Sequence, residues 1–107
     1  MTTTSNHYVT VLWEARAKPG KEAAMKAFMT AAVTASRHDP GNIDYEAHQV
    51  EGQPATFVIF ERWETREALE SHLHAPRMQD LIPQLLELMD GNIEDGIRLL
   101  QPFRPPR

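Results

Sequence analysis

The chain has 107 residues, of which 41% are hydrophobic and 24% are charged, and its composition is typical of one globular domain with a single core. Its net charge of −4 and its scattered Lys and Arg residues argue against a nucleic-acid partner. The lack of cysteine excludes disulfides and Cys-based metal sites, and the lack of an apolar run of about 18 residues argues against a membrane span.

We expect one domain over residues 8–101, between a flexible N-terminus at residues 1–7 and a Pro-rich tail at residues 102–107. The segment "MTTTSNHYV" has neither the basic nor the apolar region of a signal peptide. Together with the lack of cysteine, this predicts a cytoplasmic protein.

The first half of the domain has strand periodicity, then helix periodicity, then two further strands. Residues 8–17 alternate as a strand does. Residues 21–37 repeat apolar side chains at i, i+3, i+4 and i+7, which predicts a helix that ends at the turn sequence "DPGN". Strands at residues 43–50 and 55–63, joined by "EGQP", predict an antiparallel hairpin.

The second half is predicted to hold two helical segments and a last strand. Thr65 is a suitable N-cap for a helix that runs to about residue 74. A further helix should follow Pro76, with a kink or a division at Pro83. A strand at about residues 93–101 completes the order βαββαβ, which is typical of a ferredoxin-like α+β fold with one antiparallel sheet and its helices on one face.

The third predicted strand is apolar on both faces. Phe57 and Ile59 point to one side, and Val58 and Phe60 point to the other. The helices cover only one side of the sheet, so the other side needs another cover. A second copy of the chain is the simplest cover, and we expect a homodimer.

Three residues in the stretch "FERWETREALESHL" are candidates for chemistry. Glu61 and Trp63 share a face of the third strand, and His72 lies with Leu69 on the inward stripe of the next helix. They either fill the core or converge on a bound molecule. Spacing alone favours the core, because an inward histidine is more often a hydrogen-bonded structural residue than a catalyst.

Three segments, "KPGKEAAMKAFM", "DPGNIDYEAHQ" and "FVIFERWETREALESHLHAPRM", together resemble the antibiotic biosynthesis monooxygenase family, which includes quinol monooxygenases. The resemblance extends over residues 8–100. Its most specific part is the third-strand motif Glu61-x-Trp63 followed by the helical His72.

This resemblance implies a dimeric α+β barrel with a pocket between the sheet and the helices of each subunit. It further implies a cofactor-independent monooxygenase that oxidises a small aromatic quinol or phenol with molecular oxygen. The expected site residues are His72, Trp63 and Glu61 for catalysis, and Tyr45, Trp13, Phe28 and Leu69 for substrate binding.

Each of the three catalytic candidates has a chemical role in such a reaction. A deprotonated dihydroxyarene reduces oxygen readily, so the protein must supply a dry cavity and move a proton. His72 suits the proton transfer because an ordinary imidazole titrates near pH ~6.5. Trp63 offers an aromatic wall and an N–H donor, and Glu61 is expected to fix the tautomer of His72 or to stabilise its cation.

We expect no metal and no cofactor. The five histidines fall on different elements or on opposite helix faces, and the chain has no HExxH, GxGxxG or Walker-type sequence. A haem-degrading branch of the family has a first-strand Asn and a later helical His, but Trp13 and Ile82 occupy the corresponding positions here. We therefore expect no haem degradation.

Two further functions stay open at this point. One is a non-catalytic dimeric module that binds a small hydrophobic ligand, because a shared fold hosts many functions. The other is RNA binding on the sheet, which the net negative charge and the lack of an RNP motif in "TFVIFERW" argue against.

Overall fold

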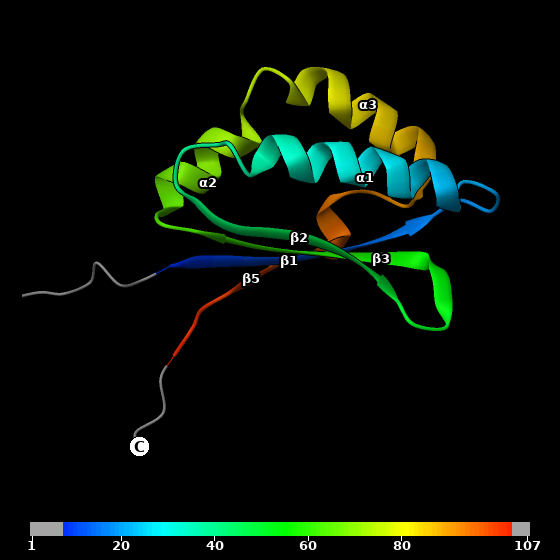
Figure 1. Ribbon diagram of the computed structural model, residues 1–107, viewed down its shortest axis with the longest axis horizontal. Helices are drawn as coiled ribbons and strands as arrows, with labels where there is room; N and C mark the ends of the chain where they lie inside the picture. Colours follow the sequence, from blue (N-terminus) through cyan, green and yellow to red (C-terminus); the bar gives the residue numbers. More distant parts are fainter. Residues whose placement is uncertain (1–7, 104–107) are drawn as a thin grey trace, which may run out of the picture.

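A computed structural model describes residues 8–103, in which one antiparallel sheet carries three helices on the same face (Figure 1). The expected ferredoxin-like α+β fold is confirmed. None of the helices in residues 8–103 has the length and apolar character needed to cross a membrane. The elements in chain order are β1 (Val9–Ala17), α1 (Glu22–Ser36), β2 (Asn42–Val50), β3 (Gln53–Trp63), α2 (Arg66–Leu73), α3 (Met78–Leu88), β4 (Met89–Asp90), the 3₁₀ turn η2 (Glu94–Gly96) and β5 (Ile97–Leu100).

The sheet has the strand order β2-β3-β1, and both β4 and β5 pair with the free side of β1. Val11 lies opposite Glu61 and Trp13 lies opposite Ile59 in the β1–β3 ladder. All four side chains are buried beneath the helices, as is Trp63. The carboxyl group of Glu61 and the indole of Trp63 therefore both lie on the helix-facing side of the sheet.

Among residues 8–103, no helix lies over the opposite side of the sheet (Figure 1). Leu12 and Phe60 are partners in the β1–β3 ladder on this side, and Val58 lies next to them. All three are half-buried. The two-sided apolar pattern of the third strand thus corresponds to one covered and one uncovered face.

The helices bury the predicted apolar stripes only in part, since α3 buries Leu85 but leaves Ile82 and Leu86 exposed. α1 buries Met25, Met29 and Val33 against the sheet. At the start of α2 the hydroxyl of Thr65 accepts a hydrogen bond from the backbone N–H of Ala68 at 3.0 Å, as expected for an N-cap. α3 lies against α1 and continues through Pro83, which removes one backbone donor but does not divide the helix.

The last strand is shorter than predicted. Strand β5 begins at Ile97, because residues 92–96 form a turn in place of the first part of the expected strand. The side chain of Asn92 accepts a hydrogen bond from the backbone N–H of Asp95 at 2.8 Å, which competes with strand pairing. Gly96 ends the turn where an added Cβ would lie 2.0 Å from the carbonyl oxygen of Glu14.

The predicted flexible segment, residues 1–7, and residues 104–107 of the predicted tail lie outside the described residues. Residues 101–103 belong to neither a helix nor a strand.

Gly41 is expected to be the glycine least tolerant of substitution among those with positive φ. It has φ +84°, and an added Cβ would lie 2.5 Å from the Cβ of Ala68. Gly52 has φ +78° but open space around it. Gly52→Ala should lower the free energy of unfolding by about 1–2 kcal/mol, because alanine is disfavoured in left-handed backbone. Gly41→Ala should lose the same amount and, because of the steric clash, about 1–3 kcal/mol more.

Urea denaturation of the two glycine variants tests this difference, because the comparison cancels the shared backbone term. Equal losses in both variants would contradict the close packing of α2 on the turn that contains Gly41.

Candidate active site

A cavity of about 180 Å³ lies between the sheet and the helices. Its walls are almost entirely apolar and come from the sheet, all three helices and the turn before β5. Four lining residues are polar, namely Ser36, Tyr45, Glu61 and His72. None of the described residues that line it is a lysine or an arginine. The cavity is therefore suited to an uncharged, mostly apolar molecule that makes a few polar contacts.

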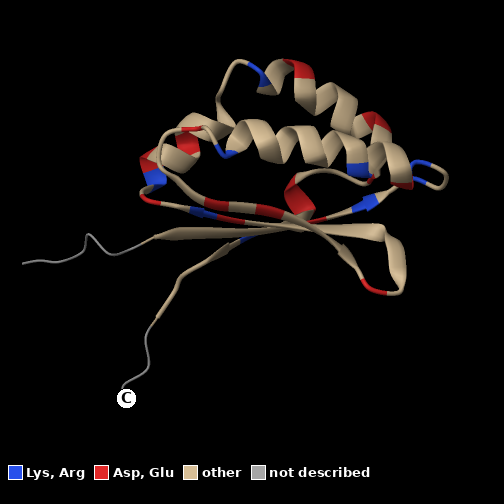
Figure 2. Ribbon diagram, in the orientation of Figure 1, with Lys and Arg blue, Asp and Glu red and all other residues tan. Residues whose placement is uncertain are grey.

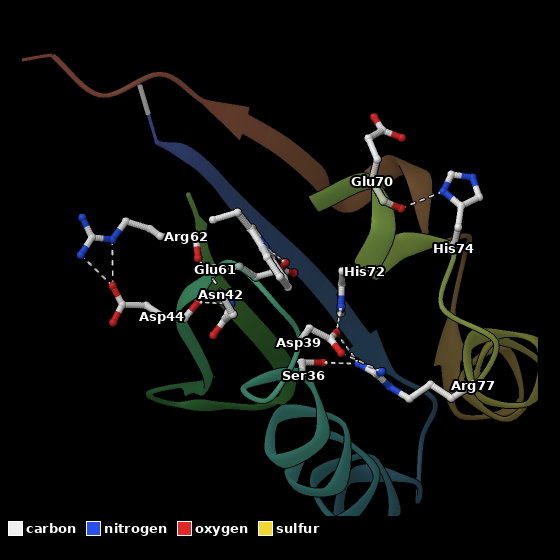
Figure 3. Close-up of polar contacts among 11 residues, drawn as sticks. Ser36, Asp39, Asn42, Asp44, Glu61, Arg62, Glu70, His72, His74 and Arg77 are labelled. Carbon is white, nitrogen blue, oxygen red and sulfur yellow. Dashed lines mark hydrogen bonds and ion pairs between the residues drawn. The ribbon is translucent and has the colours of Figure 1, made fainter. Parts of the chain in front are cut away.

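His72 is held by a carboxylate from another element (Figure 3). Its Nδ1 lies 2.7 Å from Oδ2 of Asp39, in the turn between α1 and β2. Asp39 also accepts hydrogen bonds from Arg77, with Nη2 2.6 Å from Oδ2 and Nη1 3.0 Å from Oδ1. The Nη2 group of Arg77 also lies 3.4 Å from the hydroxyl of Ser36. The Asp39–His72–Arg77 cluster thus joins the end of α1, the helix α2 and the start of α3.

Hydrogen bonds from two neighbours keep Asp39 charged. Burial favours the neutral acid, but the hydrogen bond from Arg77 and then that from His72 outweigh it, so that the pKa of Asp39 lies below its ordinary value. The hydrogen bonds that Arg77 donates to Asp39 in turn raise the pKa of Arg77. At neutral pH the carboxylate of Asp39 is therefore an acceptor with no proton of its own to donate.

Aromatic rings fix the plane of the His72 imidazole. The indole of Trp63 lies 4.7 Å away, centroid to centroid, at an interplanar angle of 35°. The ring of Tyr45 meets it edge-on at 5.5 Å. The side chain of His72 is 2% exposed, so packing and the contact with Asp39 together leave the ring little freedom.

Glu61 forms a second buried polar group beside the cavity. Its Oε1 accepts a hydrogen bond from the indole N–H of Trp63 at 2.8 Å. Burial raises the pKa of Glu61, although the hydrogen bond from Trp63 and the charge of His72 partly offset this effect. Burial and the nearby Glu61 also raise the pKa of the Tyr45 hydroxyl, which is therefore neutral at physiological pH.

The structure brings most of the expected site residues to one cavity. Trp13, Phe28, Tyr45 and Leu69 line it, as do Glu61 and His72. Trp63 does not line it. The indole is fully buried, stacks on the ring of His72 and donates its N–H to Glu61.

The partner of His72 differs from the expected one. Glu61 was expected to fix the tautomer of His72 or to stabilise its cation, but the residue bonded to Nδ1 is Asp39. Asp39, Arg77 and Ser36 were not among the predicted site residues. The only local signal was the sequence "DPGN", which was interpreted as a turn and does form one.

No group of three His, Asp or Glu side chains within residues 8–103 is arranged to hold a metal ion. What the cavity offers is a histidine, a carboxyl group and two hydroxyls at the polar part of an apolar pocket. Such groups are able to orient a hydroxyl-bearing molecule and to move one of its protons.

The two carboxyl groups predict opposite effects of pH on stability. The raised pKa of Glu61 means that its contribution to stability is fully present below the ordinary Glu pKa of about 4.3 and is lost as pH rises through the folded pKa. The lowered pKa of Asp39 has the opposite consequence, since its contribution is lost as pH falls. Glu61→Gln keeps an oxygen for the indole N–H of Trp63 but has no proton to release.

We therefore expect Glu61→Gln to gain stability relative to the unmodified protein as pH rises from about 4 towards 8. Urea denaturation of both proteins across this range measures the difference. A difference that stays constant with pH would contradict the raised pKa of Glu61.

Comparison with known proteins places the chain among relatives of the same shape. Residues 8–84 match the family described as "Antibiotic biosynthesis monooxygenase". An uncharacterized protein, sll1783 of Synechocystis sp., is 27% identical over 81 residues, which are 76% of this chain and 55% of that protein. The chain therefore spans about half the length of this curated relative.

Two solved structures show the same fold. Rv0793 from Mycobacterium tuberculosis has a TM-score of 0.81 at 24% identity, with 94% of this chain and 99% of that chain covered. PA3566 from Pseudomonas aeruginosa has a TM-score of 0.79 at 22% identity, with 97% and 100% covered.

Proposed function

Because the chain belongs to the antibiotic biosynthesis monooxygenase family, we propose that it is a cofactor-independent monooxygenase that oxidises a small aromatic quinol or phenol with molecular oxygen. The observation that carries the proposal is the position of His72. Its side chain lines an apolar cavity, and the charged Asp39 holds its Nδ1. This arrangement suits a base that takes a proton from a bound hydroxyl.

The cavity supports the proposed substrate class. Apolar walls favour an aromatic body, and the polar lining residues supply contacts for one or two hydroxyl groups. A carboxylate or phosphate substrate would be desolvated there without a lysine or arginine from the described lining residues. Figure 2 shows that basic and acidic residues are interspersed over the fold rather than gathered at one site.

The reaction balances without an added reductant. His72 takes a proton from a substrate hydroxyl, the resulting anion passes one electron to oxygen, and the two radicals combine at a ring carbon. One oxygen atom then stays on the ring and the other leaves as water. A quinol supplies all four electrons, two through oxidation to the quinone and two through conversion of a C–H bond to C–OH.

Glu61 and Trp63 have different parts in this proposal. Glu61 faces the cavity and offers a second polar contact to the substrate. Trp63 supports the two polar residues from behind, because it stacks on His72 and donates its N–H to Glu61.

Oxygen consumption with a panel of hydroquinones tests the proposed function. We expect oxygen uptake that depends on the protein and yields one hydroxyquinone per oxygen molecule. The dimethyl ethers of the same hydroquinones serve as controls, because they have the same shape and no proton for His72 to remove. Saturable binding of the hydroquinones without oxygen uptake would instead indicate a ligand-binding module.

We also propose that the active form is a homodimer joined through the uncovered sheet face. This face has an apolar strip formed by Leu12, Val58 and Phe60. A second subunit packed on this face would remove the strip from water. Stable interfaces of this kind commonly bury more than about 2,000 Å².

Sedimentation should show a dimer at micromolar concentration, and Phe60→Glu should weaken it by about 100-fold or more, because the interface would have to bury an unpaired charge. Thr30→Glu, which places the same charge on the exposed side of α1, is the matched control and should leave the dimer intact. A well-folded monomer of the unmodified protein at this concentration would contradict the dimer.

A further inference from the structure

We propose that Asp39 is a positioning residue that holds the Nδ1–H tautomer of His72 and so leaves the lone pair of Nε2 for a hydroxyl in the cavity. The catalytic consequence rests on the proposed function, whereas the tautomer itself does not. Sequence analysis assigned Asp39 only to a turn.

The contact between Asp39 and His72 determines which ring nitrogen carries the hydrogen. Oδ2 of Asp39 lies 2.7 Å from Nδ1 of His72, well within hydrogen-bond distance. A carboxylate oxygen has only lone pairs, so the hydrogen in this bond must sit on Nδ1. A neutral imidazole with its hydrogen on Nδ1 has an unprotonated Nε2.

An ordinary Asp side chain, with a pKa of about 3.9, is already ionised above pH ~6.5, and the groups around Asp39 favour its charge further. Arg77 donates to both of its oxygens, at 2.6 Å and 3.0 Å. The pKa of Asp39 is accordingly lowered in spite of its burial. The other titratable groups near the ring are Glu61 and Tyr45, and burial favours the neutral form of both. Asp39, at 2.7 Å, is thus the charged acceptor that contacts the imidazole.

The direction of the imidazole ring is set by its packing. Trp63 and Tyr45 pack against the imidazole and limit its rotation, and Nδ1 points to Asp39 in the close-up (Figure 3). His72 nevertheless lines the cavity. The ring nitrogen that remains for a bound molecule is therefore Nε2.

Asp39 and Arg77 differ in how they relate to the imidazole. Arg77 bonds to Asp39 and Ser36, but among the described residues no hydrogen bond or ion pair joins it to the imidazole. Removal of Arg77 should therefore cost stability and leave the hydrogen on Nδ1, whereas removal of Asp39 should remove the preference for Nδ1. An ion-pair cluster with a purely structural role would make no such distinction.

Long-range proton–nitrogen correlation spectra of ¹⁵N-labelled protein, recorded above the ordinary imidazole pKa of ~6.5, report directly which ring nitrogen carries the hydrogen. His72→Gln identifies the His72 signals among the five histidines. We expect the Nδ1–H form in the unmodified protein and in Arg77→Met, and a shift towards Nε2–H in Asp39→Ala. The matched control is Asp44→Ala, which breaks the partly exposed Asp44–Arg62 pair and should leave His72 unchanged.

Turnover gives the second measurement. Asp39→Ala should lower it by about 10²- to 10⁴-fold, the range known for loss of a positioned base or of its correct tautomer. Asp44→Ala should stay within about 2-fold of the unmodified protein, as expected for a partly exposed pair whose two residues do not line the cavity.

The outcomes separate this inference from the proposed function. An Nε2–H form in the unmodified protein would overturn the role of Asp39 whether or not any variant folds. Retention of the Nδ1–H form in Asp39→Ala would also overturn the role of Asp39. Loss of the Nδ1–H form in Arg77→Met would overturn it as well, because the whole cluster, and not Asp39 alone, would then determine the tautomer. The expected tautomers in a protein that consumes no oxygen would support the role of Asp39 and reject the monooxygenase.

Discussion

Replacement of His72 by alanine is expected to lower turnover by about 10²- to 10⁴-fold, the usual contribution of a positioned acid or base, while the fold survives. The imidazole lines the cavity, and Asp39 and Trp63 determine its orientation. Steady-state rates of oxygen uptake measure the effect. His48→Ala is the matched control, because the side chain of His48 on β2 is 51% exposed and lies outside the cavity lining.

A structural role for His72 makes a different prediction. His72→Ala would then cost about 1–3 kcal/mol of stability through lost packing and an unpaired Asp39, with little selective loss of activity. A substrate with a lower phenol pKa discriminates further, because it needs less help to ionise and should show a smaller deficit in the variant. An unchanged rate with a lowered melting temperature would contradict the catalytic role.

The largest loss of stability is expected at Trp63. Its side chain is fully buried, packs against His72 and Tyr45, and bonds to Glu61. Trp63→Ala should lower the free energy of unfolding by about 3–5 kcal/mol, the range for loss of a large buried aromatic. This is a large share of the roughly 5–15 kcal/mol available to a domain of this kind.

Trp63→Phe separates volume from hydrogen bonding. It keeps an aromatic ring in the core but leaves Glu61 without its indole donor, and we expect a loss of about 1–3 kcal/mol. Urea denaturation measures both variants. Phe103→Ala is the control, because Phe103 is 83% exposed and should contribute little. A loss below about 1 kcal/mol for Trp63→Ala would contradict its place in the core.

Glu61 and Asp39 show how one small core supports two carboxyl groups of different character. Asp39 meets Arg77 and His72 and has a lowered pKa, whereas the burial of Glu61 raises its pKa. Sites in which neighbouring groups have their pKa values pushed apart often divide the roles of acid and base. Here the charged carboxylate orients the histidine, and the other faces the cavity directly.

The fold could be predicted largely from periodicity. The first strand, the first helix and the hairpin each have one period over many residues, and their bounds differ from the expected ones by at most two residues. The last strand could not be predicted in the same way. Its start depends on the Asn92 turn and on the close approach of Gly96 to Glu14, and neither feature changes the apolar pattern.

The site was predictable only in part, and for a physical reason. The helix period places His72 on the inward stripe of its helix, but the strand period shows only that Glu61 and Trp63 share a face, because both faces of the third strand are apolar. The periods do not indicate depth, and Trp63 proves to lie behind the site rather than in its wall. Nor do they identify distant partners, since Asp39 lies 33 residues from His72 and 38 from Arg77.

The central claim is that this chain inserts an oxygen atom from molecular oxygen into an aromatic quinol or phenol. Turnover of a hydroquinone under oxygen-18 gas, followed by mass spectrometry of the product, tests it most directly. The proposed reaction predicts one labelled atom in each hydroxyquinone formed by the unmodified protein, and loss of this product in step with the rate in His72→Ala. Formation of only unlabelled quinone, at the same rate with and without the protein, would contradict it.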